Sequence, residues 1–156
     1  MLWKKLTTLL ASAAACVMLV SCGEAKDISM DINALAGDLK DKITYQDTLE
    51  SIEPDMIKML YDVGDLVESS VVYMGSGATA EEIAVFECKD TDTAKNEVEP
   101  IVKQHIQDQI TSFESYVPAE VAKLKEAVVR TGGKYVAVCV SDDSAAAEKI
   151  MDEYFK

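Results

Sequence analysis

The first 22 residues constrain the fold most, because they decide which part of the chain remains to fold. Lys4 and Lys5 precede an apolar run from Leu6 to Ser21, and Cys22 follows it. A basic start with a short apolar run is the layout of a secretory signal, which is removed from the mature protein. The run is too short for a comfortable transmembrane helix, which needs about 20 apolar residues. The folded domain must therefore form from the later residues, outside the cytosol.

The segment ends in Leu19, Val20, Ser21 and Cys22, and this end resembles the lipobox of bacterial lipoproteins. In that class of protein the cysteine is acylated before cleavage leaves it as the first residue. The resemblance implies a lipoprotein signal peptide over residues 1–21 and a diacylglyceryl group on Cys22. Two acyl chains suffice for stable anchoring, here at the extracytoplasmic face of the cell membrane. Two alternatives stay open, namely soluble secretion after cleavage at Ser21 and an uncleaved anchor.

The chain is strongly acidic. It carries 15 Lys+Arg against 28 Asp+Glu, a formal charge of −13 at pH 7. Removal of residues 1–21 takes away Lys4 and Lys5 but no acid, which leaves a mature charge of −15. Such a surface repels nucleic acid phosphates and anionic lipid headgroups, so we expect no nucleic acid partner and a membrane contact through the lipid alone. The excess acid either keeps the domain soluble or marks a site for a cation or a basic partner.

About 135 residues remain after cleavage, which matches one domain of the commonest size. Residues 22–30 are predicted to be the lipidated cysteine with a short tether, and residues 31–156 a single domain. The tether can span at most roughly 30 Å, so the domain would sit close to the membrane face.

Cys88 and Cys139 are the two cysteines that remain for the folded domain, and both lie in apolar, strand-like runs. An even pair in an exported chain could form one disulfide, or the two could be free buried thiols. A domain of this size does not need a disulfide bond for stability, which favours the free thiols. The sequence contains no Cys-x-x-Cys pattern, so thioredoxin-like redox chemistry has no support.

Apolar residues at helical spacing predict an amphipathic helix over Asp31–Ile43, with Ser29 or Asp31 as its N-cap. Pro54 is typical of a first helical turn and predicts a short helix to about Tyr61, which Gly64 ends. The side chains expected to face inward on this short helix are Met56, Met59 and Leu60. Met is commonly a filler of cores, although an exposed Met-rich helix would suggest a partner surface.

Two β-hairpins are predicted from β-branched and aromatic residues around glycine-containing turns. Their turns are Gly75–Gly77 and Gly132–Gly133. The four predicted strands are 66–74, 82–88, 127–130 and 134–140. The last strand is apolar at both parities, which predicts a central position in the sheet.

Helices are predicted between and after the hairpins. Caps at Asp90–Thr93 begin a long helix to Phe113, which Pro100 either kinks or delays. A short helix starts at Pro118, and Ser141–Asp143 cap a terminal helix to about Phe155. Hairpins separated by helices predict an α+β fold, an antiparallel sheet built from two β-hairpins and packed by helices as a two-layer sandwich.

Three segments carry a resemblance to a known family. They are the hairpin Leu66–Glu87, the segment Ser112–Tyr116 and the stretch Tyr135–Asp143. They look like a family of small bacterial lipoproteins described as domain of unknown function 4358, over roughly residues 31–155. The resemblance implies export and a Gram-positive-type cell envelope. It implies no established activity and no catalytic residues.

Signatures of catalysis and of cofactors are missing from the sequence. His105 is the only histidine, and its position predicts a partly exposed helix residue rather than a catalytic base. One histidine and two separated cysteines lack zinc-ligand spacing, so no metal and no cofactor are predicted. Acidic pairs such as Asp142–Asp143 are typical of helix caps rather than of calcium loops, and Glu81–Glu82 is typical of solvated surface.

The sequence therefore favours a non-catalytic protein. We expect a lipid-anchored extracytoplasmic module of the cell envelope that acts by binding an unknown envelope protein or a small ligand. The alternative is a small hydrolase or redox enzyme of the envelope, which would require a polar pocket with converging carboxylates.

Overall fold

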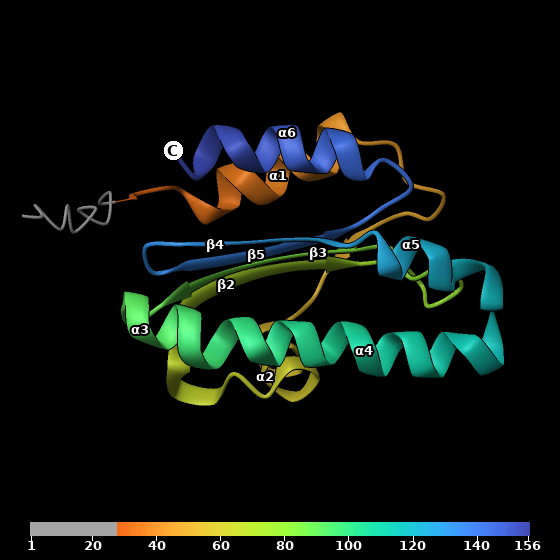
Figure 1. The fold of residues 1–156 in the computed structure, drawn as a ribbon, viewed down its shortest axis with the longest axis horizontal. Coiled ribbons are helices and arrows are strands. Elements are labelled where there is room, and N and C mark those ends of the chain that lie inside the picture. Colours follow the sequence, from red (N-terminus) through yellow and green to blue (C-terminus); the bar gives the residue numbers. More distant parts are fainter. Residues whose placement is uncertain (1–27) are drawn as a thin grey trace, which may run out of the picture.

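The computed structural model describes residues 28–156 as a five-stranded antiparallel sheet with helices on both of its faces (Figure 1). Cys22, the residues of the lipobox and the predicted signal peptide lie outside the described residues. Among residues 28–156, no helix is both long enough and apolar enough to cross a membrane.

The sheet consists of two hairpins and one short edge strand. Its strands are β1 (Glu50–Ser51), β2 (Val67–Met74), β3 (Glu82–Cys88), β4 (Val128–Gly132) and β5 (Tyr135–Val140). They lie in the order β1-β2-β3-β5-β4, and every neighbouring pair is antiparallel. The two predicted hairpins, β2–β3 and β4–β5, are confirmed. β5 lies between β3 and β4 and is buried at each position, which confirms that it is an interior strand.

The helices form two layers around this sheet. α1 (Ile32–Lys42) and α6 (Ser144–Tyr154) cover one face, and α2 (Pro54–Tyr61) and α4 (Glu99–Tyr116) cover the other (Figure 1). Shorter elements connect them. These are η1 (Gly64–Leu66), α3 (Thr91–Thr93), η2 (Ala94–Val98), η3 (Pro118–Glu120) and α5 (Val121–Lys125).

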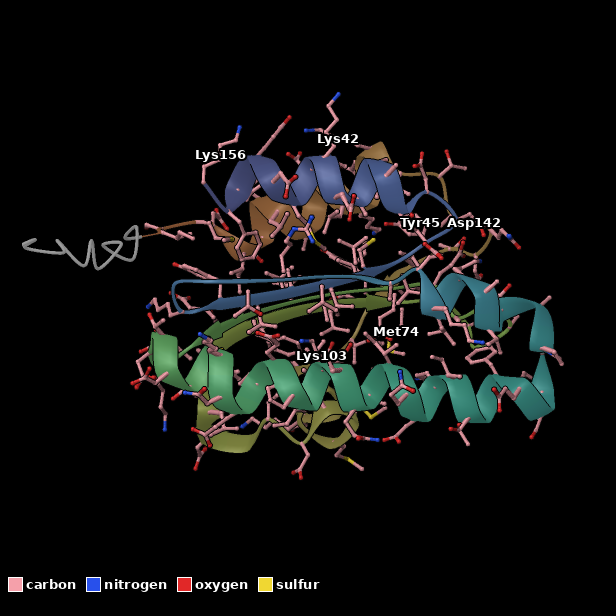
Figure 2. All side chains as sticks on the ribbon, in the orientation of Figure 1. Lys42, Tyr45, Met74, Lys103, Asp142 and Lys156 are labelled. Atoms are coloured by element: carbon pink, nitrogen blue, oxygen red, sulfur yellow. The ribbon has the colours of Figure 1, made fainter. Side chains whose placement is uncertain are left out.

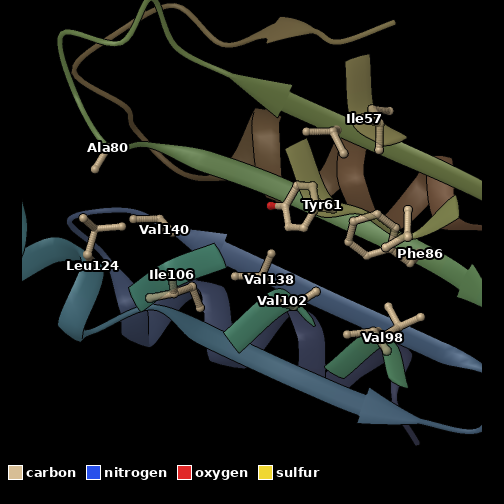
Figure 3. Packing of buried hydrophobic residues seen from close by; sticks show 14 of the residues in the cluster. Ile57, Tyr61, Ala80, Phe86, Val98, Val102, Ile106, Leu124, Val138 and Val140 are labelled. Atoms are coloured by element: carbon tan, nitrogen blue, oxygen red, sulfur yellow. The ribbon is translucent and has the colours of Figure 1, made fainter. Parts of the chain in front are cut away.

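Two separate cores follow from this arrangement. Ala84 and Phe86 of β3 point into the core beneath α2 and α4, where Phe86 packs edge-to-face on Tyr61 (Figure 3). Ile83 and Val85 of the same strand point into the core beneath α1 and α6. The α+β class and the antiparallel sheet are confirmed, but the prediction of two layers is wrong. A strand that is apolar on both faces needs cover on both, so the fold has three layers.

The helix caps lie where the sequence predicts them. The Asp31 carboxylate accepts hydrogen bonds from two backbone N–H groups at the start of α1, and Asp143 accepts one from Ala146 at the start of α6. Asp90 caps α3 in the same way. These bonds satisfy amide groups that a helix cannot pair by itself.

The long helical segment from Thr91 to Tyr116 contains Pro100 and is not interrupted by it. α3, η2 and α4 follow one another directly, so helical structure begins at Thr91, as the caps predict. η2 is a π-helical turn that ends at Val98, two residues before Pro100. Proline has no N–H to donate and its ring crowds the preceding turn, and a wider π turn accommodates both effects.

The buried face of α2 differs from the predicted one. Ile57 and Tyr61 are buried, whereas Met56 and Met59 are 52% and 80% exposed. Leu60 is 36% exposed as well, so the inward assignment of these three side chains is wrong. The helix ends at Tyr61, as predicted, but Asp62 rather than Gly64 adopts the left-handed conformation directly after it (φ 49°).

The segment before α1 packs onto the domain. Ile28 and Met30 contact the core beneath α1 and α6, and the Met30 N–H donates to the Tyr135 hydroxyl at 3.4 Å. A Cβ on Gly132 or Gly133 would lie 2.8 or 3.2 Å from Ile28. The chain therefore enters the fold against the β4–β5 turn.

Candidate functional site

β4 is an edge strand with one hydrogen-bonded neighbour, β5. The turn between them is two residues long, and Gly132 lies opposite Tyr135 next to it. In such a hairpin the flanking residues exchange both hydrogen bonds, and the pattern alternates along the strand. Val129 and Thr131 therefore direct their backbone N–H and C=O groups away from β5.

The contact made by Arg130 agrees with this alternation. Its guanidinium Nη1 donates to the Val129 carbonyl at 3.4 Å, which requires that this oxygen point away from the sheet. The outer edge of β4 thus carries backbone groups that can form hydrogen bonds with a further strand.

A groove of about 720 Å³ runs along this edge. On one side α4 contributes Ile106 and Ile110, which lie one turn apart and also contact the core. On the other side α6 contributes Ser144 and Ala145. Leu124 of α5 lies at one end. The groove exists because the first turn of α6 has small side chains beside the strand, while α4 has branched apolar ones.

Charged side chains of both signs line the groove, and one of its cations, Lys103, is paired with Glu99 at 2.5 Å. Its cations are Lys103 on α4 (Figure 2), Lys125 and Arg130, and its carboxylates are Glu126 and Glu148. The Arg130 guanidinium also contacts Asp152 at 3.1 Å and Glu148 at 3.6 Å. These contacts hold Arg130 on the α6 side of β4.

Two buried polar clusters lie away from the groove. In the first, Glu81 is 1% exposed and accepts hydrogen bonds from the backbone N–H groups of Gln46 and Asp47, both at 2.9 Å. The Lys123 ammonium lies 3.2 Å from Glu81 and 3.1 Å from Glu120. This cluster joins α5, the β2–β3 turn and the loop before β1, near the end of the sheet where Figure 2 marks Tyr45 and Asp142.

The second cluster joins α2, β3 and α4. The Glu82 carboxylate accepts a hydrogen bond from the Tyr61 hydroxyl, and His105 Nε2 lies 3.1 Å from it. The rings of Tyr61 and His105 are 4.2 Å apart. Burial alone lowers the pKa of His105, but the hydrogen bond and negative charge of Glu82 outweigh it, so the pKa is raised. Burial, with the charge of Glu82, also raises the pKa of Tyr61.

These clusters correct one interpretation of the sequence. Glu81–Glu82 is buried rather than solvated. His105 is largely buried too, with 10% of its side chain exposed. The Leu60 backbone is a second hydrogen-bond partner of this ring and also raises its pKa. The geometry suits an ion pair that holds α2 and α4 on the sheet.

Cys88 and Cys139 are buried free thiols on opposite faces of the sheet. Cys88 belongs to the core beneath α2 and α4, and Cys139 to the core beneath α1 and α6. Burial raises the pKa of Cys88 to about 12 and that of Cys139 to about 11. Both therefore stay protonated at neutral pH, and a protonated thiol is a poor nucleophile.

The remaining candidate residues have local roles. Gly77 and Gly133 adopt positive φ values in the two hairpin turns, as their turn assignment requires. Within residues 28–156, no group of three or more histidine, cysteine or acidic side chains is arranged to hold a metal ion. The groove itself was not predicted, because α4, β4 and α6 meet only in the folded chain.

One family model matches the chain over residues 41–141, and its description is domain of unknown function (DUF4358). The match contains all five strands and α4, whereas α6 and most of α1 lie outside it. No curated protein and no solved structure matches the chain.

Proposed function

The chain belongs to the family of domain of unknown function 4358, whose description states no activity, and on that premise we propose that it is a lipid-anchored domain of the cell envelope that binds its ligand in the groove beside β4. The observation that carries this proposal is a groove of about 720 Å³ along a sheet edge whose backbone groups face outward. That volume lies within the range of ligand sites, about 300–1,000 Å³.

Anchoring is supported by the lipobox-like sequence that ends at Cys22. Ile28, the first described residue, packs against the β4–β5 turn at one end of β4. Residues 23–27 can span at most roughly 20 Å. A lipid on Cys22 would therefore hold this end of β4, and the groove beside it, close to the bilayer.

The chemistry of the groove and that of the buried pair Glu82 and His105 support binding rather than catalysis. The groove offers backbone groups, apolar side chains and a few charges, which suit recognition. The acid–base groups of Glu82 and His105 are instead buried and engaged with each other, away from the groove.

Site-specific photo-crosslinking tests the proposal. We would place a photoreactive amino acid at Gln107, which lines the groove, or at Gln104, which is exposed one turn away on α4. In intact cells we expect an adduct of the membrane-bound protein from position 107 and none from position 104. Equal adducts from the two positions, or adducts from neither, would contradict binding in the groove.

A further inference from the structure

The outer side of α2 carries apolar side chains that the fold does not use. Met56, Met59 and Leu60 are 52%, 80% and 36% exposed, whereas the helix contacts the core through Ile57 and Tyr61. Within residues 28–156, four large apolar side chains are exposed, and three of them form this α2 patch. Single exposed apolar residues are ordinary, but a contiguous group of them marks an interaction site.

We propose that the α2 patch binds a basic amphipathic helix of another protein. The apolar side chains of that helix would pack on Met56, Met59 and Leu60. Its lysine or arginine side chains would lie near Asp55 and Asp62. This surface is separate from the groove beside β4, because no residue of α2 lines that groove.

Charge around the α2 patch favours a basic occupant. Glu53, Asp55, Asp62 and Asp65 are all exposed, and Lys58 is the one cation between Glu53 and Asp65. None of these five side chains forms an ion pair with another residue that the structure describes. Their negative charge is therefore not neutralised within the described fold and can attract a positively charged ligand.

The spacing of the apolar side chains favours a helical occupant. Met59 and Leu60 follow Met56 by three and four residues within α2, so the three side chains are neighbours on the helix surface. A second helix that crosses α2 would present its own side chains to them at the same spacing. Asp55 lies one turn before Met59, and Asp62 directly follows the helix. Carboxylates thus border the patch toward both of its ends.

Two other occupants fit the α2 patch less well. A second copy of this chain carries the same carboxylates, so contact between two patches would bring like charges together. The same carboxylates repel the anionic headgroups of a bilayer, and helices that lie in a membrane surface typically have lysine and arginine on their polar face. Acidic side chains beside exposed apolar ones therefore favour a positively charged amphipathic partner.

Titration of the full-length protein with a synthetic peptide tests the proposal. The protein is purified from membranes into phosphatidylcholine nanodiscs and is isotope-labelled at its methionine methyl groups for NMR. The probe is a capped amphipathic peptide with leucine on one face and lysine on the other. We expect it to shift the signals of Met56 and Met59 but not that of Met151, which is fully buried. The same peptide with glutamate in place of lysine should bind about tenfold more weakly.

Two double substitutions separate the patch from the net charge of the chain. Asp55→Asn with Asp62→Asn removes carboxylates beside α2, and asparagine tolerates the left-handed conformation of position 62. Asp41→Asn with Glu153→Gln removes exposed carboxylates from α1 and α6, in the other helical layer. We expect the first variant to bind the lysine peptide about tenfold more weakly and the second to change affinity less than about twofold. Circular dichroism would show that both remain folded.

A pair of single substitutions tests the apolar contact. Met59→Gln places an amide at the most exposed position of the patch, and we expect it to weaken peptide binding about tenfold, read from the Met56 signal. Tyr116→Gln is the matched control, since Tyr116 is 72% exposed on α4 and lies outside the patch. It should leave the affinity unchanged.

Three results would overturn this proposal. They are unchanged Met56 and Met59 signals with the lysine peptide, equal binding of the two peptides, and equal weakening by the two double substitutions. Broadening of the Met59 signal by spin-labelled lipid before peptide is added would assign the patch to the bilayer instead. A dimer that Met59→Gln dissociates would assign it to a second copy. None of these results involves the groove, whose crosslinking from position 107 tests the proposed function separately.

Discussion

Glu82 joins three elements on the α4 side of the sheet. It lies on β3, accepts a hydrogen bond from Tyr61 at the end of α2 and contacts His105 in the middle of α4. Removing one partner of a buried ion pair leaves the other charge uncompensated, which costs about 3–5 kcal/mol. The buried contact between Tyr61 and Glu82 therefore holds α2 against the sheet, although the outer side of this helix is exposed.

This ion pair predicts how stability depends on pH. The pKa of His105 is raised in the fold above its ordinary value of 6.5. Its contribution to stability is therefore full below pH 6.5 and is lost as the pH rises through the folded pKa. We expect the difference in the free energy of unfolding between wild type and His105→Gln to shrink over that range. Urea unfolding at a series of pH values measures it, and a difference that grows with pH would contradict the ion pair.

Residues such as Glu81 and Glu82 show where a local interpretation of the sequence fails. Two adjacent acids in an acidic chain are typical of solvated surface. Their partners, Lys123 and His105, lie in other elements and approach only after the sheet and helices have packed. Nothing in the immediate sequence neighbourhood indicates that either carboxylate is buried.

At the scale of elements, local signals predict most of the structure. The caps at Asp31, Asp90 and Asp143 are where the helices begin, and both glycine turns join predicted strands. Each of these features depends on a few neighbouring residues. A local sequence is therefore enough to place them.

Features that depend on distant residues were missed. The two-residue strand β1 exists because it pairs with Met74 and Tyr73 of β2. α2 buries Ile57 and Tyr61 because these face the sheet, which leaves Met56 and Met59 on the surface. The helical pattern of such a short segment does not decide which side meets the core.

The three layers of the whole molecule follow from β3 and β5. Both strands are apolar on both faces, so the sheet needs α1 and α6 on one side and α2 and α4 on the other. β5 is apolar at both parities, which predicts an interior strand, but the predicted two-layer sandwich covers only one of its two faces. The groove arises where these two helical layers flank the uncovered edge of β4.

The proposed attachment to the membrane concerns the whole chain, because it depends on the N-terminal segment that ends at Cys22. We expect Cys22→Ala to abolish incorporation of a palmitate analogue and to release the protein or leave it as a precursor. Cys16→Ala is the matched control, since it removes a thiol from the same N-terminal segment and should keep the label. Cell fractionation with lipid labelling measures both. Unchanged labelling and retention of the Cys22 variant would argue against the lipid anchor.

The outer edge of β4 is expected to be open in the free protein. Amide hydrogen exchange resolved by residue, measured by NMR on the purified protein, tests it most directly. We expect the amides of Val129 and Thr131 to exchange fast, and those of Arg130 and Gly132, which face β5, to be protected. If these two amides are already as protected as that of Arg130 without ligand, the edge is covered and cannot pair with a ligand.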